Sequence, residues 1–276
     1  MDEPAVGSSS TRHGLRDEHR PRRPATICCG LVAGLLSGIF GVGGGFLIVP
    51  ALTLFLHMDQ RRAHGTSLAA VIPIAAAGVI GYALHGDLDL SYALFLILGA
   101  ALGALVGTYL LSVLGGRTLR LAFAALLVAA ALRLALPTPE ATGHQELTIP
   151  LAAGLIALGA VSGVLAGLFG VGGGIVIVPA LILFFGVTDV VAKGTSLLVI
   201  LPTALVGTAS NLRRGNADIG IAALLGGSGV LAAFLGVQIA ARLNHTLSTA
   251  TFAVLLLVAS ARLATTRERP ARTTAE

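Results

Sequence analysis

Long hydrophobic stretches separated by short polar segments dominate the chain. Apolar runs without Asp, Glu, Lys or Arg extend over residues 24–58, 63–86, 90–116, 121–132, 147–188, 194–212, 219–241 and 243–261. About 20 helical residues cross the hydrocarbon core of a bilayer, so most of these runs are long enough to span it. Strands of a membrane barrel would need a polar residue at every second position, which the runs lack. The pattern predicts an all-α polytopic membrane protein.

Composition supports this class. Hydrophobic residues make up 55% of the 276 residues and charged residues only 11%, and the mean hydropathy is +0.90. Soluble domains carry about 25% charged residues. The net charge of +5 comes from lysines and arginines at the ends of the runs and in the terminal segments. That placement indicates membrane topology, with a lipid bilayer and no nucleic acid as the partner.

The sequence contains two copies of one unit. A shift of 129 positions aligns residues 31–136 with 160–265 without a gap, and about four in ten positions are identical. We expect a basic, disordered arm (1–24), a first membrane repeat (25–136), a linker (137–147), a second repeat (148–265) and a basic tail (266–276). Each repeat would hold a glycine-broken hydrophobic segment followed by three transmembrane helices.

The glycine breaks are the most unusual feature of both copies. "GIFGVGGGFLIVPAL" (38–52) and "GLFGVGGGIVIVPAL" (167–181) interrupt otherwise good helices. Outer glycines such as Gly34 and Gly38 have the small-xxx-small spacing of helix packing. Three consecutive glycines exceed what packing needs, since each costs about 1 kcal/mol of helix propensity. We therefore expect one half-helix to end and another to begin there.

Basic residues indicate how the broken segments run. If each segment is re-entrant and turns back at the glycines, most internal basic residues share the side of the N-terminus: Arg61, Arg62, Arg117, Arg120, Arg213 and Arg214. Only Arg133, Lys193 and Arg242 would then lie opposite, which fits the positive-inside rule with a cytoplasmic N-terminus. The two halves would be inverted, as in many transporters. A simple crossing remains the alternative.

A broken helix at membrane depth exposes amide donors that protein, water or a ligand must satisfy. A half-helix N-terminus attracts anions, and glycine allows a ligand to approach the backbone closely. The candidate backbone donors are Gly43, Gly44, Gly45, Gly172, Gly173 and Gly174. The motifs "HGTSLA" and "KGTSLL" add Thr66, Ser67, Thr195 and Ser196, which would either cap the next helices or turn hydroxyls toward a substrate. Asn211 is a weaker cavity-lining candidate.

The apolar runs show no sign of catalysis. They contain no paired carboxylates, no metal-ligand spacing and no serine in register with a histidine. His64 and His85 fall at the ends of their runs, where we expect them to be solvated. The sequence thus predicts no catalytic residue, no metal site, no cofactor and no enzyme.

The duplicated "GxxxGxFGVGGGxxxVPAL", followed about 13 residues later by "GTSL", and the later "RRGNADIG" resemble the sulfite exporter TauE/SafE family of bacterial membrane permeases. The resemblance covers residues 27–263. It implies a multi-pass carrier of the bacterial inner membrane for small sulfur-containing anions such as sulfite or organosulfonates. By motif it makes the glycine triplets and the Thr-Ser pairs candidates for the substrate path.

We therefore expect a transporter that exports a small anionic substrate by alternating access at the interface of the repeats. Two alternatives stay open: a non-transporting membrane scaffold, in which the repeats only pack helices, and an anion channel. The direction of transport, the coupling ion and the formation of a homo-oligomer do not follow from the sequence.

Overall fold

The computed structural model of the protein describes residues 23–135, 147–243 and 245–265. These residues are almost entirely helical and form no strand, which confirms the all-α prediction. The first repeat contains α1 (Arg23–Phe40), α2 (Gly45–Phe55), α3 (Gln60–His85), α4 (Leu90–Val113) and α5 (Gly116–Ala135). The second contains α6 (Ile149–Phe169), α7 (Gly174–Phe185), α8 (Asp189–Arg213), α9 (Ile219–Ala240) and α10 (His245–Thr265).

Six of the described helices are long and apolar enough to cross a membrane: α1, α3, α4, α6, α8 and α9. Leucines on their outer faces are exposed, for example Leu102 on α4 (69%) and Leu231 on α9 (76%). Such faces fit a bilayer, in which apolar side chains need no covering. Of the expected arm (1–24), linker (137–147) and tail (266–276), residues 1–22, 136–146 and 266–276 lie outside the described ranges.

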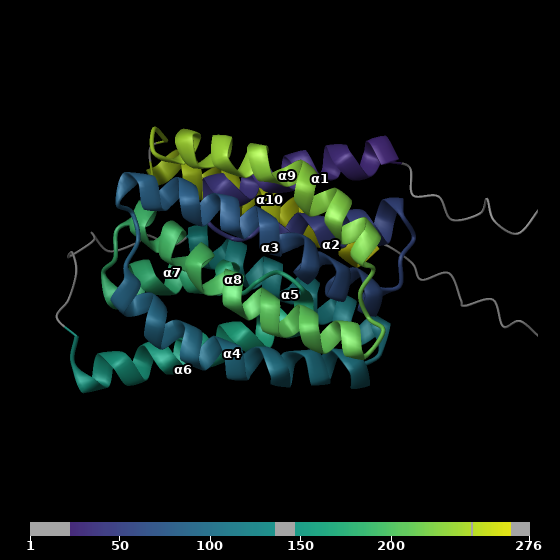
Figure 1. The fold of residues 1–276 in the computed structure, drawn as a ribbon, viewed down its shortest axis with the longest axis horizontal. Helices are drawn as coiled ribbons and strands as arrows, with labels where there is room; N and C mark the ends of the chain where they lie inside the picture. The colour runs from purple at the N-terminus through teal and green to yellow at the C-terminus, as the bar shows by residue number, and fades with distance from the viewer. Residues whose placement is uncertain (1–22, 136–146, 244, 266–276) are drawn as a thin grey trace, which may run out of the picture.

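The long helices exchange partners between the two repeats. In Figure 1, α1 and α9 lie along one edge of the molecule, α4 and α6 along the opposite edge, and α3 and α8 between them. Thus α1 of the first repeat packs on α9 of the second, and α6 of the second repeat packs on α4 of the first. The helices α5 and α10 pair with each other and complete the bundle. Neither repeat buries its helices alone.

Glycines allow the two outer pairs to approach closely. A Cβ built on Gly34 of α1 would lie 2.2 Å from the carbonyl oxygen of Gly229, and one on Gly163 of α6 would lie 2.2 Å from that of Ala100. Residue numbers increase together along the two helices, from the contact of Gly30 with Leu225 to the contact of Gly38 with Ala233. The helices α1 and α9 therefore run parallel. These contacts confirm the predicted packing role of the outer glycines.

The chain turns back at each break. After α1 ends at Phe40, Gly44 lies beside Ala33, where an added Cβ would be 2.6 Å from the Ala33 carbonyl oxygen. Gly173 lies beside Ser162 in the same way. The segment α1–α2 therefore begins and finishes at one end of the bundle, and α6–α7 at the other end. The re-entrant arrangement is the one that the chain adopts.

We call the two ends of the bundle the terminal end, where α1 begins, and the linker end, where α6 begins. At the terminal end, the guanidinium Nη2 of Arg61 donates to the carbonyl oxygen of Leu114 at 2.8 Å, and Arg62 pairs with Asp218 at 3.1 Å. These bonds place the starts of α3 and α9 beside the end of α4. The two repeats are inverted relative to each other.

Candidate functional site at the paired glycine breaks

The two breaks lie against each other in the centre of the bundle. A Cβ on Gly45 would fall 2.5 Å from the carbonyl oxygen of Gly170, and one on Gly174 would fall 2.7 Å from the Cα of Val42. All residues of both breaks are buried. The sequence placed these six central glycines at two separate positions of the chain, and the fold brings them together.

Glycine is required here by backbone conformation. In the first break, φ is +70° at Gly41, +79° at Gly43 and +74° at Gly44, and in the second Gly172 and Gly173 have φ of +83° and +84°. L-residues with side chains rarely adopt this left-handed region. The short helices α2 and α7 each begin directly after such a residue, with Gly44 and Gly173 as their N-caps. The repeated triplets therefore start two half-helices at the centre.

Some amides of these turns bond within the protein, and others have no partner among the described residues. Gly41 donates to Ser37 at 2.8 Å, and Leu47 and Ile48 donate to the Gly44 carbonyl oxygen at 3.1 and 3.2 Å. Within the described ranges, no hydrogen bond is donated by the amides of Gly43, Gly44 and Gly45, nor by those of Gly172, Gly173 and Gly174. Buried amides normally find a partner, so six amides without one among the described residues are unusual.

Residues of α3 fix the second break. The Nδ1 atom of His64 lies 2.6 Å from the carbonyl oxygen of Phe169, and the hydroxyl of Ser67 donates to the carbonyl oxygen of Gly170 at 2.8 Å. The carbonyl can only accept, so Nδ1 carries the proton. The other ring nitrogen, Nε2, is buried and has no hydrogen-bond partner in the described chain.

The first break has the corresponding residues of α8 beside it. Lys193 and Ser196 occupy the positions of His64 and Ser67 in the second repeat, and an added Cβ on Gly41 would lie 2.5 Å from the Lys193 Cα. Lys193 Nζ donates to Asp189 Oδ2 at 2.6 Å. The Ser196 hydroxyl is buried and, among the described residues, has no partner. The two repeats therefore offer different polar groups at equivalent places.

Apolar side chains close the space around the breaks. An added Cβ on Gly43 would meet Val71 at 3.0 Å and Ile200 at 3.3 Å, and one on Gly172 would meet Ile200 at 2.7 Å. Behind the breaks, the ring of Phe252 stacks on Phe40 with centroids 4.6 Å apart. The centre of the molecule is thus closed in this conformation.

The threonines of the two GTS motifs make hydrogen bonds between helices. The Thr66 hydroxyl accepts from the amide of Asp218 at 2.9 Å, and the Thr195 hydroxyl accepts from the amide of Asp89 at 2.9 Å. Neither threonine caps its own helix, because α3 begins at Gln60 and α8 at Asp189, more than one turn earlier. The capping interpretation was wrong for these residues and for Ser67 and Ser196. The threonines instead join helices of different repeats.

Asn211 and His64 are both fully buried. Asn211 is fully buried near the end of α8, where its side-chain nitrogen donates to the carbonyl oxygen of Gly207 at 3.0 Å and its oxygen has no partner within the described ranges. His64 is fully buried, which corrects the prediction of a solvated histidine. Lys193, expected at a membrane edge, is also buried with 3% exposure. The alignment of the two repeats pairs His64 with Lys193, which was the signal in the sequence that these two residues occupy equivalent places.

The amino-acid sequence is similar to those of known membrane proteins. The model of the family "Sulfite exporter TauE/SafE" matches residues 5–134 and 155–276, one segment for each repeat. The "Probable membrane transporter protein YunE" of Bacillus subtilis (strain 168) is 27% identical over 255 residues, which cover 84% of this chain and 92% of that protein. A "Probable membrane transporter protein" of Xylella fastidiosa (strain 9a5c) is 31% identical over 223 residues, or 79% of this chain and 85% of the relative. The chain therefore belongs to the sulfite exporter TauE/SafE family of membrane transporters.

Proposed function

We propose that this membrane transporter exports a small sulfur-containing anion, such as sulfite or an organosulfonate, and binds it between the two glycine breaks. The observation that carries the proposal is a set of six buried amides, three at the start of α2 and three at the start of α7, that have no acceptor within the described ranges. Two half-helix N-termini that meet at one place direct their partial positive charges at the same space. An oxyanion with several acceptor atoms satisfies such donors better than a neutral solute does.

Polar side chains beside the breaks support an anionic substrate. The Ser196 hydroxyl can donate to an oxyanion, and Nε2 of the neutral His64 ring is an acceptor. Both are buried, and among the described residues neither has a partner. A buried polar group without a partner costs about 1–3 kcal/mol of stability, so its retention favours a role in binding. Ser67 holds the second break in place, while Thr66 and Thr195 join α3 to α9 and α8 to α4, so all three contribute indirectly.

The symmetry of the bundle supports alternating access. Inverted repeats with broken helices at their interface are the recurring design of secondary transporters. Because each repeat packs on helices of the other, a rocking motion of one against the other would open the breaks first to one end and then to the other. Val71 and Ile200, which contact the break glycines, would form the central gate. The closed centre favours a carrier over a permanently open channel.

The distribution of basic side chains supports a cytoplasmic terminal end in a bacterial inner membrane. The starts of α3 and α5 and the end of α8 provide that end with Arg61, Arg62, Arg117, Arg120, Arg213 and Arg214. The linker end has three basic residues in the described ranges, of which Lys193 is bonded to Asp189. The positive-inside rule then orients the terminal end toward the cytoplasm.

Efflux of radiolabelled sulfite from proteoliposomes tests the proposal. We expect saturable efflux from vesicles with the wild-type protein and at least tenfold slower efflux with Ser196→Ala, because one donor to the anion is lost. Ser162→Ala is the matched control, since the Ser162 hydroxyl is buried but bonded to the Gly159 carbonyl oxygen. Removing the Ser196 hydroxyl, which has no partner in the described chain, should raise the melting temperature slightly, because the cost of burying it disappears.

Each result has a distinct meaning. Equal efflux through Ser196→Ala and wild type would refute the assignment of the site. Absence of flux for sulfite, sulfate, thiosulfate and sulfonates in the folded wild-type protein would instead favour the scaffold. Unitary current steps in planar bilayers would identify a channel.

A further inference from the structure

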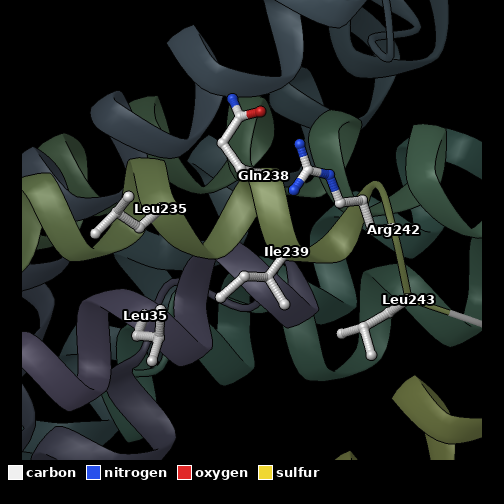
Figure 2. A pocket seen from close by; sticks show the side chains of 6 residues that line it. All are labelled: Leu35, Leu235, Gln238, Ile239, Arg242 and Leu243. Carbon is white, nitrogen blue, oxygen red and sulfur yellow. The ribbon is translucent and has the colours of Figure 1, made fainter.

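A pocket of ≈ 490 Å³ lies on the outer face of the α1–α9 pair, toward the linker end (Figure 2). Its size falls within the range of about 300–1,000 Å³ that is typical of small-molecule sites. Six residues of α1, α9 and the turn after α9 line it: Leu35, Leu235, Gln238, Ile239, Arg242 and Leu243. The pocket is separate from the buried breaks, since two of its residues, Leu235 and Ile239, are 58% and 42% exposed.

The lining separates into an apolar part and a polar part. Figure 2 shows the side chains of Gln238 and Arg242 next to each other on one side of α9, with the four leucine and isoleucine side chains along the rest of the pocket. A guanidinium and a carboxamide together offer several N–H donors to a phosphate. The apolar side chains offer a surface to a hydrocarbon chain. This combination matches an amphipathic anion.

Arg242 lies just beyond the end of α9, a helix long enough to cross a membrane. It follows α9 directly, and its amide donates to the Ile239 carbonyl oxygen at 3.0 Å, which fixes the turn. In the described part of the chain, its guanidinium makes no ion pair and no hydrogen bond to a side chain. Arginines at the ends of spanning helices extend to the membrane interface, where they meet phosphates.

The duplicated unit provides an internal comparison. The α4–α6 pair repeats the packing of α9 on α1, and there Tyr109 and Val113 occupy the positions of Gln238 and Arg242. Since the same helix pair forms without the amide and the guanidinium, packing does not require them. Their presence in one copy only indicates a separate purpose.

We propose that the α1–α9 pocket binds an anionic glycerophospholipid, with the phosphate on Arg242 and Gln238 and an acyl chain along Leu35, Leu235 and Ile239. A free anion would gain nothing from the apolar side chains, and a zwitterionic lipid would gain less from the arginine, because its own cation competes for the phosphate. The site is independent of the breaks and of the substrate carried there. A lipid bound here would bridge a helix of each repeat.

Native mass spectrometry of the full-length protein tests the lipid site. The protein is reconstituted with equal amounts of phosphatidylglycerol and phosphatidylcholine that have identical acyl chains, and the retained lipids are counted. We expect the wild type to retain phosphatidylglycerol in preference, and Arg242→Gln to lower the ratio of the two lipids about fivefold. Arg133→Gln is the matched control, because it removes one positive charge at the same end from a residue outside the pocket.

The proposal fails if Arg242→Gln and wild type retain the two lipids in the same ratio. It also fails if Arg133→Gln lowers the ratio as much as Arg242→Gln, because the preference would then reflect surface charge alone. A second variant, Gln238→Leu, keeps the apolar wall and should lower the ratio less than Arg242→Gln. The sulfite efflux assay is read separately and does not affect this outcome.

Discussion

At the scale of single residues, glycines on α1 set the distance between α1 and α9. We predict that Gly34→Ala lowers the stability of the protein by about 1–3 kcal/mol, because the new Cβ would lie 2.2 Å from the Gly229 carbonyl oxygen and cannot be accommodated without moving α9. Thermal unfolding in detergent, followed by circular dichroism, measures the change.

Gly227 provides the control in the same helix pair. It lies within α9, its backbone is helical, and a Cβ there would have no neighbour within 4 Å. Gly227→Ala should therefore raise stability by about 0.5–1 kcal/mol through helix propensity alone. Equal effects of the two substitutions would show that close approach of α1 to α9 does not matter for stability.

His64 combines a structural bond with a free acceptor atom. We predict that His64→Gln slows sulfite efflux about tenfold or more while the melting temperature changes little, because glutamine can still donate to the Phe169 carbonyl oxygen but offers no second ring nitrogen. His64→Leu should slow efflux and also lower the melting temperature. If His64→Gln transports like wild type, the Nε2 atom has no part in binding.

At the scale of helices, two threonine hydroxyls join the repeats. The Thr66 hydroxyl on α3 accepts a hydrogen bond from the amide of Asp218, the residue just before α9. In the same way, the Thr195 hydroxyl on α8 accepts a hydrogen bond from the amide of Asp89, the residue just before α4. We predict that Thr66→Val lowers stability by about 1–3 kcal/mol, because the Asp218 amide loses its acceptor inside the protein. Thr66→Ser keeps the oxygen and should cost much less. Urea or heat unfolding measures the stability of both variants. Equal losses of stability would contradict the role of the Thr66 hydroxyl.

This bond explains why the sequence alone could not assign the GTS motif. A hydroxyl early in an apolar run suggests a cap or a substrate ligand, and only the position of Asp218, far along the chain, reveals a third role. Similarly, the charge pattern placed Lys193 at a membrane edge, while its bond to Asp189 allows burial. Contacts between the repeats decide these cases, and a single sequence does not record them.

Features that depend on local chemistry were predictable. The glycine triplets indicated broken helices because residues with side chains rarely adopt the positive φ of Gly43 and Gly172. The arginine distribution indicated the hairpin at each break, since Arg61 and Arg213 share an end only when the segment turns back. The exchange of α1 and α6 between repeats was not predictable, because both copies present the same small-xxx-small surface to any partner.

At the scale of the whole molecule, the hairpins determine the inversion of the repeats. Each repeat has a re-entrant segment and three further helices, α3 to α5 and α8 to α10, so the second repeat begins at the end opposite to the first. The α2–α3 turn and the α7–α8 turn then lie at opposite ends of the bundle. This gives each face of the membrane one hairpin, and the two breaks meet between them.

Cysteine labelling tests this inversion directly. The experiment introduces one cysteine at a time into a Cys28→Ser, Cys29→Ser background, either His57→Cys in the α2–α3 turn or Thr188→Cys in the α7–α8 turn. Both of these turn residues are exposed. We predict that a membrane-impermeant maleimide added to intact cells labels Thr188→Cys but reaches His57→Cys only after the membrane is opened, because the positive-inside rule orients the terminal end toward the cytoplasm. If each broken segment crossed the bilayer instead, the two cysteines would lie on the same face and react alike. Labelling of both in intact cells, or of neither, would therefore exclude the inverted hairpins on which the shared site depends.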